Sequence, residues 1–164
     1  MNHRRPATAE DDDFLWRLYV STRDAEIASL GWPAAQQEAF LKMQYRARSG
    51  SYSAMYPGAE RQIVTDHGAP AGAVMVARNS REIRLVDIAF LPPFRNRGYG
   101  ADEIRMLIRE SDQTSLPLRL SVMRANPAIR LYQRLGFIPV AEDGMYIEME
   151  YRPDGGAVVN GTSS

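Results

Sequence analysis

Residues 83–101 read Ile-Arg-Leu-Val-Asp-Ile-Ala-Phe-Leu-Pro-Pro-Phe-Arg-Asn-Arg-Gly-Tyr-Gly-Ala, and this stretch decides the fold. Apolar residues dominate its first half as far as Leu91, which predicts a strand. Pro92 and Pro93 end that strand, because proline cannot donate to a ladder of hydrogen bonds. Gly98 and Gly100 then open a segment with apolar residues at helical spacing. The stretch therefore predicts a strand, a short loop and a helix, in that order.

The start of this predicted helix has the properties of an anion site. The first turn of a helix leaves backbone N–H groups without partners, and the helix dipole adds positive potential there. Gly98 and Gly100 would let a phosphate approach the backbone closely. Arg95 and Arg97 would supply positive charge alongside.

Two common phosphate-binding motifs do not fit this loop. A dinucleotide fingerprint needs a third glycine, and Glu103 stands at that position. A phosphate loop of the Walker type needs Gly-Lys, and the single lysine of the chain, Lys42, lies far from any such loop. Both nucleotide classes are therefore disfavoured.

The segments before this stretch predict two helices and three strands, the first of which is an N-terminal extended segment that ends near Ala7. Thr8-Ala9-Glu10-Asp11 forms a capping box ahead of an apolar stripe that contains Phe14, Leu15, Leu18 and Tyr19. A second helix is expected from Pro33 to just before Gly50. Residues 62–64 and 73–76 then predict a hairpin around a turn at residues 66–68.

The segments after it predict a strand, a helix and a final hairpin. Residues 118–123 read as a strand, and Asn126-Pro127 reads as the start of a helix that Gly136 stops. Residues 137–140 and 145–151 flank a turn. The whole order is β-α-α-β-β-β-α-β-α-β-β, which predicts a mixed α/β sheet covered by helices.

Length and charge set the broad class. The chain has 164 residues, of which 45% are hydrophobic, and its 20 basic residues balance its 20 acidic residues. These values predict one domain, over residues 1–151. Residues 152–164 are rich in glycine, serine, asparagine and aspartate, which predicts a disordered tail. Because duplex binding needs a surplus of basic residues, a nucleic-acid-binding module that uses the arginines is disfavoured.

The absence of cysteine narrows the chemistry further. Without cysteine there are no disulfides, thiolate metal sites or cysteine nucleophiles, and with only His3 and His67 a multi-histidine metal site is hard to build, so no metal is expected. No apolar segment is long enough to span a bilayer, and Asp11 to Asp13 fall where a signal peptide needs its apolar segment. We expect a cytoplasmic protein without a membrane partner.

Two motifs resemble one known family. Arg95-Asn96-Arg97-Gly98-Tyr99-Gly100 is similar to the Arg/Gln-x-x-Gly-x-Gly signature of the GNAT superfamily of N-acetyltransferases. Residues 131–137, Leu-Tyr-Gln-Arg-Leu-Gly-Phe, resemble its second motif, Leu-Tyr-x-x-x-Gly-Phe. The resemblance covers roughly residues 4 to 151. It implies a mostly antiparallel sheet flanked by helices, with two parallel strands that splay apart to admit acetyl-CoA or another acyl-CoA.

The resemblance implies how the donor would bind. The pyrophosphate would lie on the backbone N–H groups of Arg95, Asn96, Arg97, Gly98, Tyr99 and Gly100, with Ala101 in the same first turn. The pantetheine arm would pair with Ile88, Ala89 and Phe90 like an added strand. The Phe90 amide would donate to the thioester carbonyl and stabilise the developing oxyanion. Asn126 would help to hold the arm, although its spacing from Tyr132 is one residue shorter than in many members, and a role as helix cap stays open.

The resemblance also implies a general acid, and the strand offers a carboxylate. Tyr132 would protonate the departing CoA thiolate, although its place on an apolar stripe would otherwise predict a core residue. Asp87 is the one charge on the apolar face that Ile83 and Leu85 share, so it would act as general base or hold a cationic substrate. Two alternatives remain open: Asp87 forms a structural ion pair with an arginine, or a water chain acts as the base in its place.

The expected function is direct transfer of an acetyl group to a primary amine in a ternary complex. The acceptor would be a small molecule or a protein terminus, and a homodimer is compatible with the sequence. The alternative from another class is a non-catalytic acyl-CoA-binding or regulatory module of the same fold. Tyrosine and methionine side chains in residues 45–56 would line an acceptor pocket or simply pack.

Overall fold

The computed structural model describes residues 2–153, and it confirms the predicted order of strands and helices. The predicted tail lies, from residue 154 on, outside the described residues. The elements are β1 (Asn2–Pro6), the 3-10 helix η1 (Ala9–Asp11), α1 (Asp12–Ala28), α2 (Ala34–Met55), β2 (Glu60–Asp66), β3 (Ala69–Arg78), β4 (Ile83–Phe90), the 3-10 helix η2 (Pro92–Phe94), α3 (Tyr99–Thr114), β5 (Leu118–Met123), α4 (Ile129–Arg134), β6 (Ile138–Glu142) and β7 (Tyr146–Tyr151).

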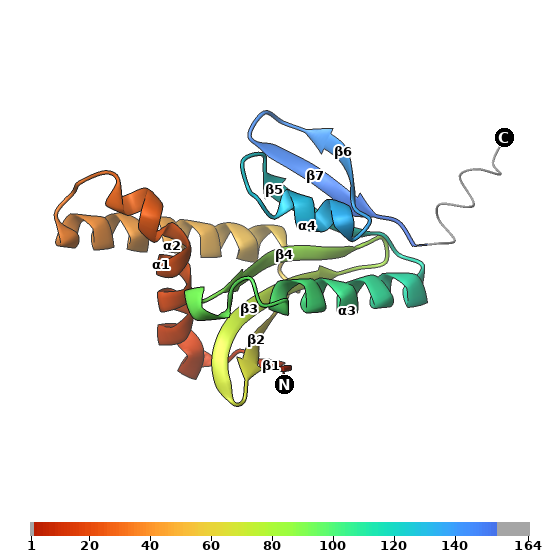
Figure 1. Ribbon diagram of the computed structural model, residues 1–164, viewed down its shortest axis with the longest axis horizontal. Helices are drawn as coiled ribbons and strands as arrows, with labels where there is room; N and C mark the ends of the chain where they lie inside the picture. Colours follow the sequence, from red (N-terminus) through yellow and green to blue (C-terminus); the bar gives the residue numbers. More distant parts are fainter. Residues whose placement is uncertain (1, 154–164) are drawn as a thin grey trace. The chain divides into compact units, whose positions relative to one another are not determined.

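The strands form one seven-stranded sheet in the order β1-β2-β3-β4-β5-β7-β6 (Figure 1). β4 and β5 run parallel, with Ile83 opposite Leu118 and Leu85 opposite Leu120. The pairs β1–β2, β5–β7 and β6–β7 are antiparallel. The predicted mixed, mostly antiparallel sheet with one parallel pair is therefore confirmed.

The chain divides into two compact units by its internal contacts. The first contains Met1–Met75 and Asp87–Arg97, and the second contains Val76–Val86 and the residues from Gly98 onward. Strands β3 and β4 contribute residues to both units. The single domain over residues 1–151 remains a prediction.

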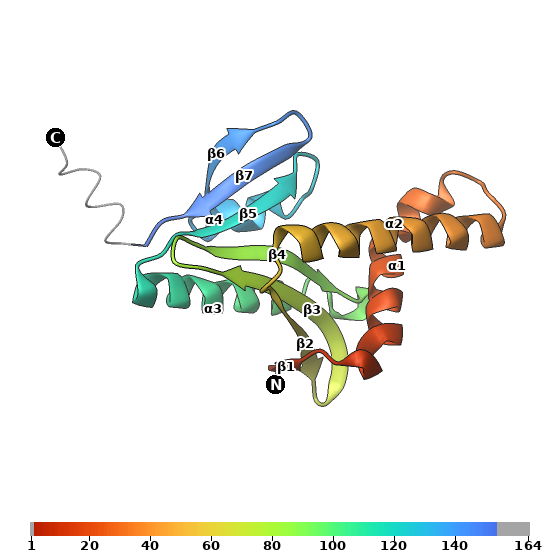
Figure 2. The same ribbon diagram turned by 180° about the vertical axis from the view of Figure 1, so that it is seen from behind.

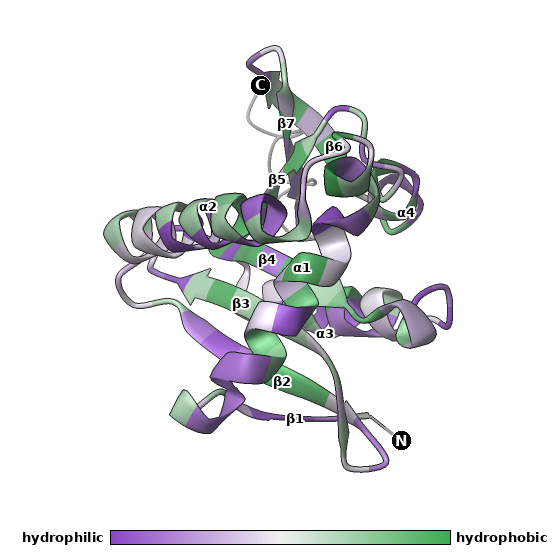
Figure 3. Cartoon of the chain, turned by 90° about the vertical axis from the view of Figure 1, so that its left-hand side faces the viewer, coloured by the Kyte–Doolittle hydropathy of each residue, from purple (hydrophilic) through white to green (hydrophobic). Residues whose placement is uncertain are grey.

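The core of the first unit lies between α1 and the strands β2 and β3. Phe14, Leu15 and Leu18 repeat at helical spacing and pack on Ile63 and Ala73. All five are buried. Each large apolar side chain contributes roughly 1.5–3 kcal/mol by leaving water. Figure 3 shows the matching hydropathy: β2 and β3 carry hydrophobic segments, and β1 is largely hydrophilic.

The entry to α1 is fixed by the predicted capping box. The Thr8 Oγ1 accepts from the Glu10 amide at 3.3 Å, and the Asp11 carboxylate accepts from the Thr8 amide at 2.8 Å. Arg5 donates to both Asp11 carboxylate oxygens at 2.8 Å. The hydrogen bonds from Arg5, and then from the Thr8 amide, lower the pKa of Asp11 to about 2. The carboxylate form is thus strongly favoured in the folded chain.

We expect Asp11→Asn to lower the melting temperature by a few degrees at pH 7. The pKa of Asp11 is about 2 when folded and about 3.9 in an unfolded chain. A folded-state pKa below the unfolded value stabilises above the unfolded pKa, and this contribution is lost as pH falls. The difference from the parent protein is therefore complete above about pH 5 and disappears near pH 2.

The matched control is Asp13→Asn, which removes an exposed carboxylate from the first turn of α1, two residues after Asp11. Melting curves from pH 7 to pH 2 test the pair. A pH-independent difference at Asp11, or an equal loss in both variants, would contradict the assignment.

Helix α2 is longer than predicted. The expected end before Gly50 is wrong, because the helix continues through Gly50 to Met55. A glycine inside a helix costs only about 1 kcal/mol relative to alanine. Beyond the glycine, Tyr52 packs on the same helix face as Tyr45 and Arg48, and such contacts outweigh that cost. In Figure 1, α2 crosses α1 in the first unit.

The second unit is built around α3. Ile104 and Leu107 are buried on one helix face, as the spacing predicts, and α3 contacts β5. Leu118 and Leu120 of β5 are also buried. The Ser111 hydroxyl donates to the carbonyl of Leu116 just beyond the helix end. Figure 2 shows β5, β7 and β6 side by side in the same unit.

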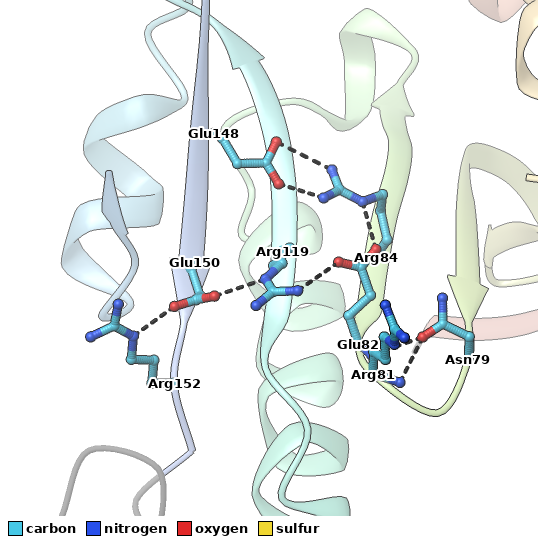
Figure 4. Close-up of polar contacts among 8 residues, drawn as sticks. All are labelled: Asn79, Arg81, Glu82, Arg84, Arg119, Glu148, Glu150 and Arg152. Carbon is cyan, nitrogen blue, oxygen red and sulfur yellow. Dashed lines mark hydrogen bonds and ion pairs between the residues drawn. The ribbon is translucent and has the colours of Figure 1, made fainter. Parts of the chain in front are cut away.

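A network of opposite charges runs across strands β4, β5 and β7 of this unit (Figure 4). The strand register places Arg84 beside Arg119, and Arg119 beside Glu150. Burial alone would raise the pKa of Glu82 and of Glu150, but hydrogen bonds from arginines bring both values below the ordinary one. Each of these two carboxylates contacts two guanidinium groups, so the positive and negative charges of the network neutralise one another. Its members are Glu82, Arg84, Arg119, Glu148, Glu150 and Arg152.

Candidate active site

The residues that the sequence singles out fall in both compact units. Asp87 to Arg97 lie in the first unit, and Gly98 to Ala101, Asn126 and Tyr132 lie in the second.

In the first unit, the loop after β4 is shaped by its two prolines. Pro92 and Pro93 start the short helix η2, and the Arg95 amide closes it by donating to the Pro92 carbonyl at 3.2 Å. The Arg97 Nη1 donates to the Pro93 carbonyl at 3.3 Å, and its guanidinium lies 5.8 Å from the centre of the Phe94 ring. The loop is thus held by its own backbone and side chains.

Arg95 ties the end of β4 to α1. Its Nε donates to the Phe90 carbonyl at 2.8 Å, and its Nη2 donates to the carbonyl and hydroxyl of Ser21 at 3.2 Å. The guanidinium and the backbone amide are both engaged within the first unit. The structure therefore gives Arg95 a role in holding Phe90 in place, and its contact with a phosphate stays a prediction.

In the second unit, α3 begins at a glycine. Gly98 is the N-cap and adopts the left-handed conformation, with φ +87°. Asn96, one residue before Arg97, is also left-handed, with φ +59°. Gly98 has no side chain with which to cap this end of α3, whereas the Thr8 side chain caps η1. Since the first turn of a helix has N–H groups without intrahelical acceptors, this end suits an anion.

Gly98 also leaves room for a ligand. A Cβ atom built on Gly98 would meet no atom of the described residues within 4 Å. The side of the backbone on which a side chain would stand is therefore open.

The strand segment that the resemblance assigns to the donor depends on Gly72 of β3. A Cβ atom at Gly72 would lie 2.4 Å from the Ala89 carbonyl oxygen and 2.4 Å from Cδ1 of Phe90. The Leu91 amide donates to the Ala71 carbonyl at 2.9 Å. The backbone of β3 thus approaches residues 89–90 more closely than any side chain would allow.

Sequence reasoning missed Gly72. A signal was present, because a glycine inside a strand marks a close approach of another backbone or a ligand. The sequence alone does not say which strand makes that approach.

Tyr132 is held by the turn that ends α4. The Phe137 amide donates to the Tyr132 carbonyl at 3.0 Å, and the Gly136 amide donates to the Gln133 carbonyl at 3.1 Å. Gly136 has φ +102°. These two bonds form a Schellman motif, which explains the spacing of tyrosine, glycine and phenylalanine in the sequence. The Tyr132 and Phe137 rings lie 5.7 Å apart, the apolar contact that accompanies this motif.

Tyr132 is also buried, with 6% of its surface exposed. The burial agrees with the apolar stripe, and the catalytic role assigned to Tyr132 stays a prediction. Within the same unit, Phe137 contacts Tyr151, whose hydroxyl donates to the Asp112 carboxylate at 2.9 Å.

Asn126 turns the chain into α4. Its Oδ1 accepts from the Ala128 amide at 2.8 Å, and its carbonyl accepts from the Ile129 amide at 3.2 Å. The Asn126 side chain therefore caps the turn that leads into α4, although α4 itself begins only at Ile129. Its part in binding a donor stays a prediction.

Asp87 lies beside Arg48 of α2. The Arg48 Nη1 and the Asp87 Oδ2 are 3.3 Å apart, and both side chains are about one quarter exposed. This is the arginine pair that the sequence left open as the alternative to a catalytic carboxylate. The partner could not be chosen from the sequence, because 39 residues separate the two positions.

Three tyrosines surround the Arg48 guanidinium. Its carbon lies 4.8 Å from the ring centre of Tyr19, 5.3 Å from that of Tyr52 and 5.9 Å from that of Tyr45. Burial, and then the nearby Asp87 charge, raise the pKa of the Tyr52 hydroxyl. The tyrosines of residues 45–56 therefore do more than pack on one another, because they hold a cation next to Asp87.

Two further kinds of site are absent from residues 2–153. No group of three or more histidine, aspartate or glutamate side chains is arranged to hold a metal ion. Within the same residues, none of the helices has the length and apolar composition that a membrane span requires.

Solved structures share this fold. The PaiA N-acetyltransferase of Thermoplasma acidophilum, in complex with coenzyme A, aligns with a TM-score of 0.70 at 14% identity, over 93% of this chain and 99% of that one. An acetyltransferase from Thermus thermophilus aligns with a TM-score of 0.64 at 18% identity, over 93% and 97%. The ribosomal-protein-S18-alanine N-acetyltransferase of Escherichia coli aligns with a TM-score of 0.59 at 22% identity, over 93% and 94%.

At sequence identities of 14–22%, this structural similarity establishes the fold alone. No curated protein matches the chain. The Acetyltransferase (GNAT) family, in contrast, matches residues 14–137, about three quarters of the sequence. The matched range contains both motifs, the glycine start of α3 and the turn that holds Tyr132. The chain belongs to the GNAT family of acetyltransferases.

Proposed function

We propose that this protein is an acetyl-CoA-dependent N-acetyltransferase that transfers the acetyl group directly to a primary amine in a ternary complex. The observation that carries the proposal is the start of α3 at a left-handed glycine, Gly98, in a member of the GNAT family. A helix start of this kind is built for a phosphate group. The coenzyme A bound to the related PaiA enzyme supports the choice of donor.

In the proposed reaction, the amine attacks the thioester carbonyl and forms a tetrahedral oxyanion. The new C–N bond forms and the C–S bond breaks. The Phe90 amide stabilises the oxyanion, because an aimed N–H donor is most effective where charge develops. Tyr132 gives its proton to the leaving thiolate, and Asp87 or a water molecule takes the proton from the amine.

A covalent acetyl-cysteine intermediate is not part of the proposal, because the sequence contains no cysteine. The absence of cysteine also simplifies the assay of CoA release. Thiol released from CoA can be measured with a chromogenic disulfide without background from the protein.

Replacing Gly98 with valine tests the donor site. Valine is strained at φ +87°, and its methyl groups would stand beside the first-turn amides of α3. We expect the acetyl-CoA dissociation constant, measured by isothermal titration, to rise about tenfold or more.

Gly68→Val is the matched control. Gly68 has φ +84° in the turn between β2 and β3, and it too has no atom within 4 Å of an added Cβ. The strain is the same, so Gly68→Val should melt earlier but bind acetyl-CoA normally. Equal donor affinity in the two variants would refute the phosphate assignment at α3. Donor binding without thiol release for any amine would instead favour an acyl-CoA-binding module.

A further inference from the structure

Arg48 is held in one orientation by aromatic rings. Tyr19, Tyr45 and Tyr52 lie within 6 Å of its guanidinium carbon. The rings also contact one another, since the centres of Tyr19 and Tyr45 are 5.0 Å apart and that of Trp16 is 5.4 Å from Tyr45. A guanidinium against several ring faces loses little mobility when a ligand binds, because it is already oriented.

The polar edge of Arg48 is only partly used. A guanidinium has five N–H donors. The oxygen atoms that the structure brings to it are the Asp87 Oδ2, at 3.3 Å, and the hydroxyl of the neighbouring Tyr52. Its Nε is buried and has no hydrogen-bond partner within residues 2–153, so this donor is not one that a ligand reaches. The Arg48 side chain as a whole is 27% exposed, so part of it faces solvent, where a ligand can approach.

A rigid guanidinium with unused donors is a receptor for a carboxylate. Asp87, 24% exposed and 3.3 Å away, offers the opposite charge to a cation. Arg48 and Asp87 therefore present a positive and a negative group side by side. The complementary ligand carries an ammonium and a carboxylate equally close together, and an α-amino acid does so because both groups stand on one carbon atom.

We propose that the acceptor of this enzyme is a free α-amino acid, whose carboxylate binds Arg48 and whose amino group lies at Asp87. The proposal rests on the proposed N-acetyltransferase function. Before transfer, the ammonium loses one proton to water. The neutral amine then attacks the thioester, its second proton passes to Asp87 or to water as the C–S bond breaks, and the thiolate takes its proton from Tyr132. Arg48 determines specificity and orients the acceptor.

Other acceptors fit these charges less well. A polyamine would bring a second cation toward Arg48, where like charges repel. The first residue of a protein has an amide in place of the carboxylate, and a neutral carbonyl makes a weaker bond to guanidinium than a carboxylate does. A simple amine has no carboxylate beside its amino group, so it leaves N–H donors of Arg48 without a partner.

Matched acceptors test the proposal. For a panel of side chains, kcat/KM is measured for the L-amino acid, for its amide, and for the amine that lacks the carboxyl group. We expect the best free amino acid to exceed its own amide and amine by about tenfold or more, because a site built for a charged group rejects analogues that lack it.

Substitutions in α2 test whether Arg48 causes this preference for the free amino acid. Arg48→Met keeps the packing on the rings but removes the charge, and it should lower kcat/KM for the free amino acid about tenfold while leaving the amide nearly unchanged. Arg48→Lys should restore part of the loss, because it returns the charge without the planar fork. The control is Arg46→Met, which removes an exposed arginine from the same helix. The acetyl-CoA dissociation constant should not change in any of them.

Two results would overturn the proposal: amides or simple amines that match the free amino acid in the parent protein, or an equal loss for all three acceptors in Arg48→Met. If no acceptor releases CoA although acetyl-CoA binds, the proposed catalytic function fails instead. The acceptors are then titrated against the protein saturated with CoA. Preferential binding of the free amino acid that Arg48→Met abolishes would support the inference, and its absence would refute it.

Discussion

Tyr132→Phe is expected to reduce turnover about 100-fold while the dissociation constant for acetyl-CoA stays close to that of the parent protein. The substitution removes one hydroxyl and keeps the ring. The ring is what packs 5.7 Å from Phe137 and completes the turn at Gly136, so the fold of α4 should persist. The loss then measures proton transfer to the departing thiolate.

The matched control for this variant is Tyr151→Phe. It also removes a tyrosine hydroxyl from the second unit, one that donates to Asp112 at 2.9 Å, and it should leave turnover unchanged. Steady-state kinetics with saturating acetyl-CoA and isothermal titration of the donor provide the two readouts. Unchanged turnover in Tyr132→Phe would make Tyr132 a packing residue, as its 6% exposure and apolar stripe alone suggest.

Gly72→Ala is expected to destabilise the protein severely, by about 3 kcal/mol or more. One methyl group would stand 2.4 Å from the Ala89 carbonyl oxygen, which is a backbone atom and cannot turn aside. Overpacking a tight interior costs typically 1–3 kcal/mol, and more where backbone must move. Since whole domains are stable by only about 5–15 kcal/mol, this single atom removes a large share.

Gly50→Ala is the control, and it should act in the opposite direction. Gly50 lies inside α2, and an added Cβ atom there meets nothing within 4 Å. Alanine in a helix is favoured over glycine by about 1 kcal/mol, so this variant should be slightly more stable. Urea unfolding of both variants tests the contrast. Stability equal to that of the parent protein in Gly72→Ala would mean that β4 shifts easily beside β3.

The local parts of the candidate site follow from the sequence. The left-handed Gly98 at the start of α3, the box between Thr8 and Asp11, and the turn at Gly136 each depend on residues at most five positions apart. Hydrogen bonds over such short spans depend on which residue types stand at those positions. The sequence therefore shows these motifs directly. The order of strands and helices follows from hydrophobic periodicity for the same reason.

The misjudged details are those in which packing overrides local preference. Gly50 marks a helix end by propensity, yet Tyr52, two residues further on, packs on Arg48 and the helix continues. Gly72 interrupts an apolar run, and only the pairing of β3 with β4 shows that Ala89 and Phe90 require it.

The sequence by itself determined the family, the order of elements and the short motifs that bind backbone to backbone. Only the tertiary structure decided the long-range partners. Nineteen arginines could neutralise Asp87, and the choice of Arg48, 39 residues away, is made where α2 and β4 meet in the first unit. Arg84 likewise finds Glu148 across 64 residues because the strand register brings them together. A carboxylate attracts every guanidinium alike, so its partner is selected by the packing that places one of them within reach.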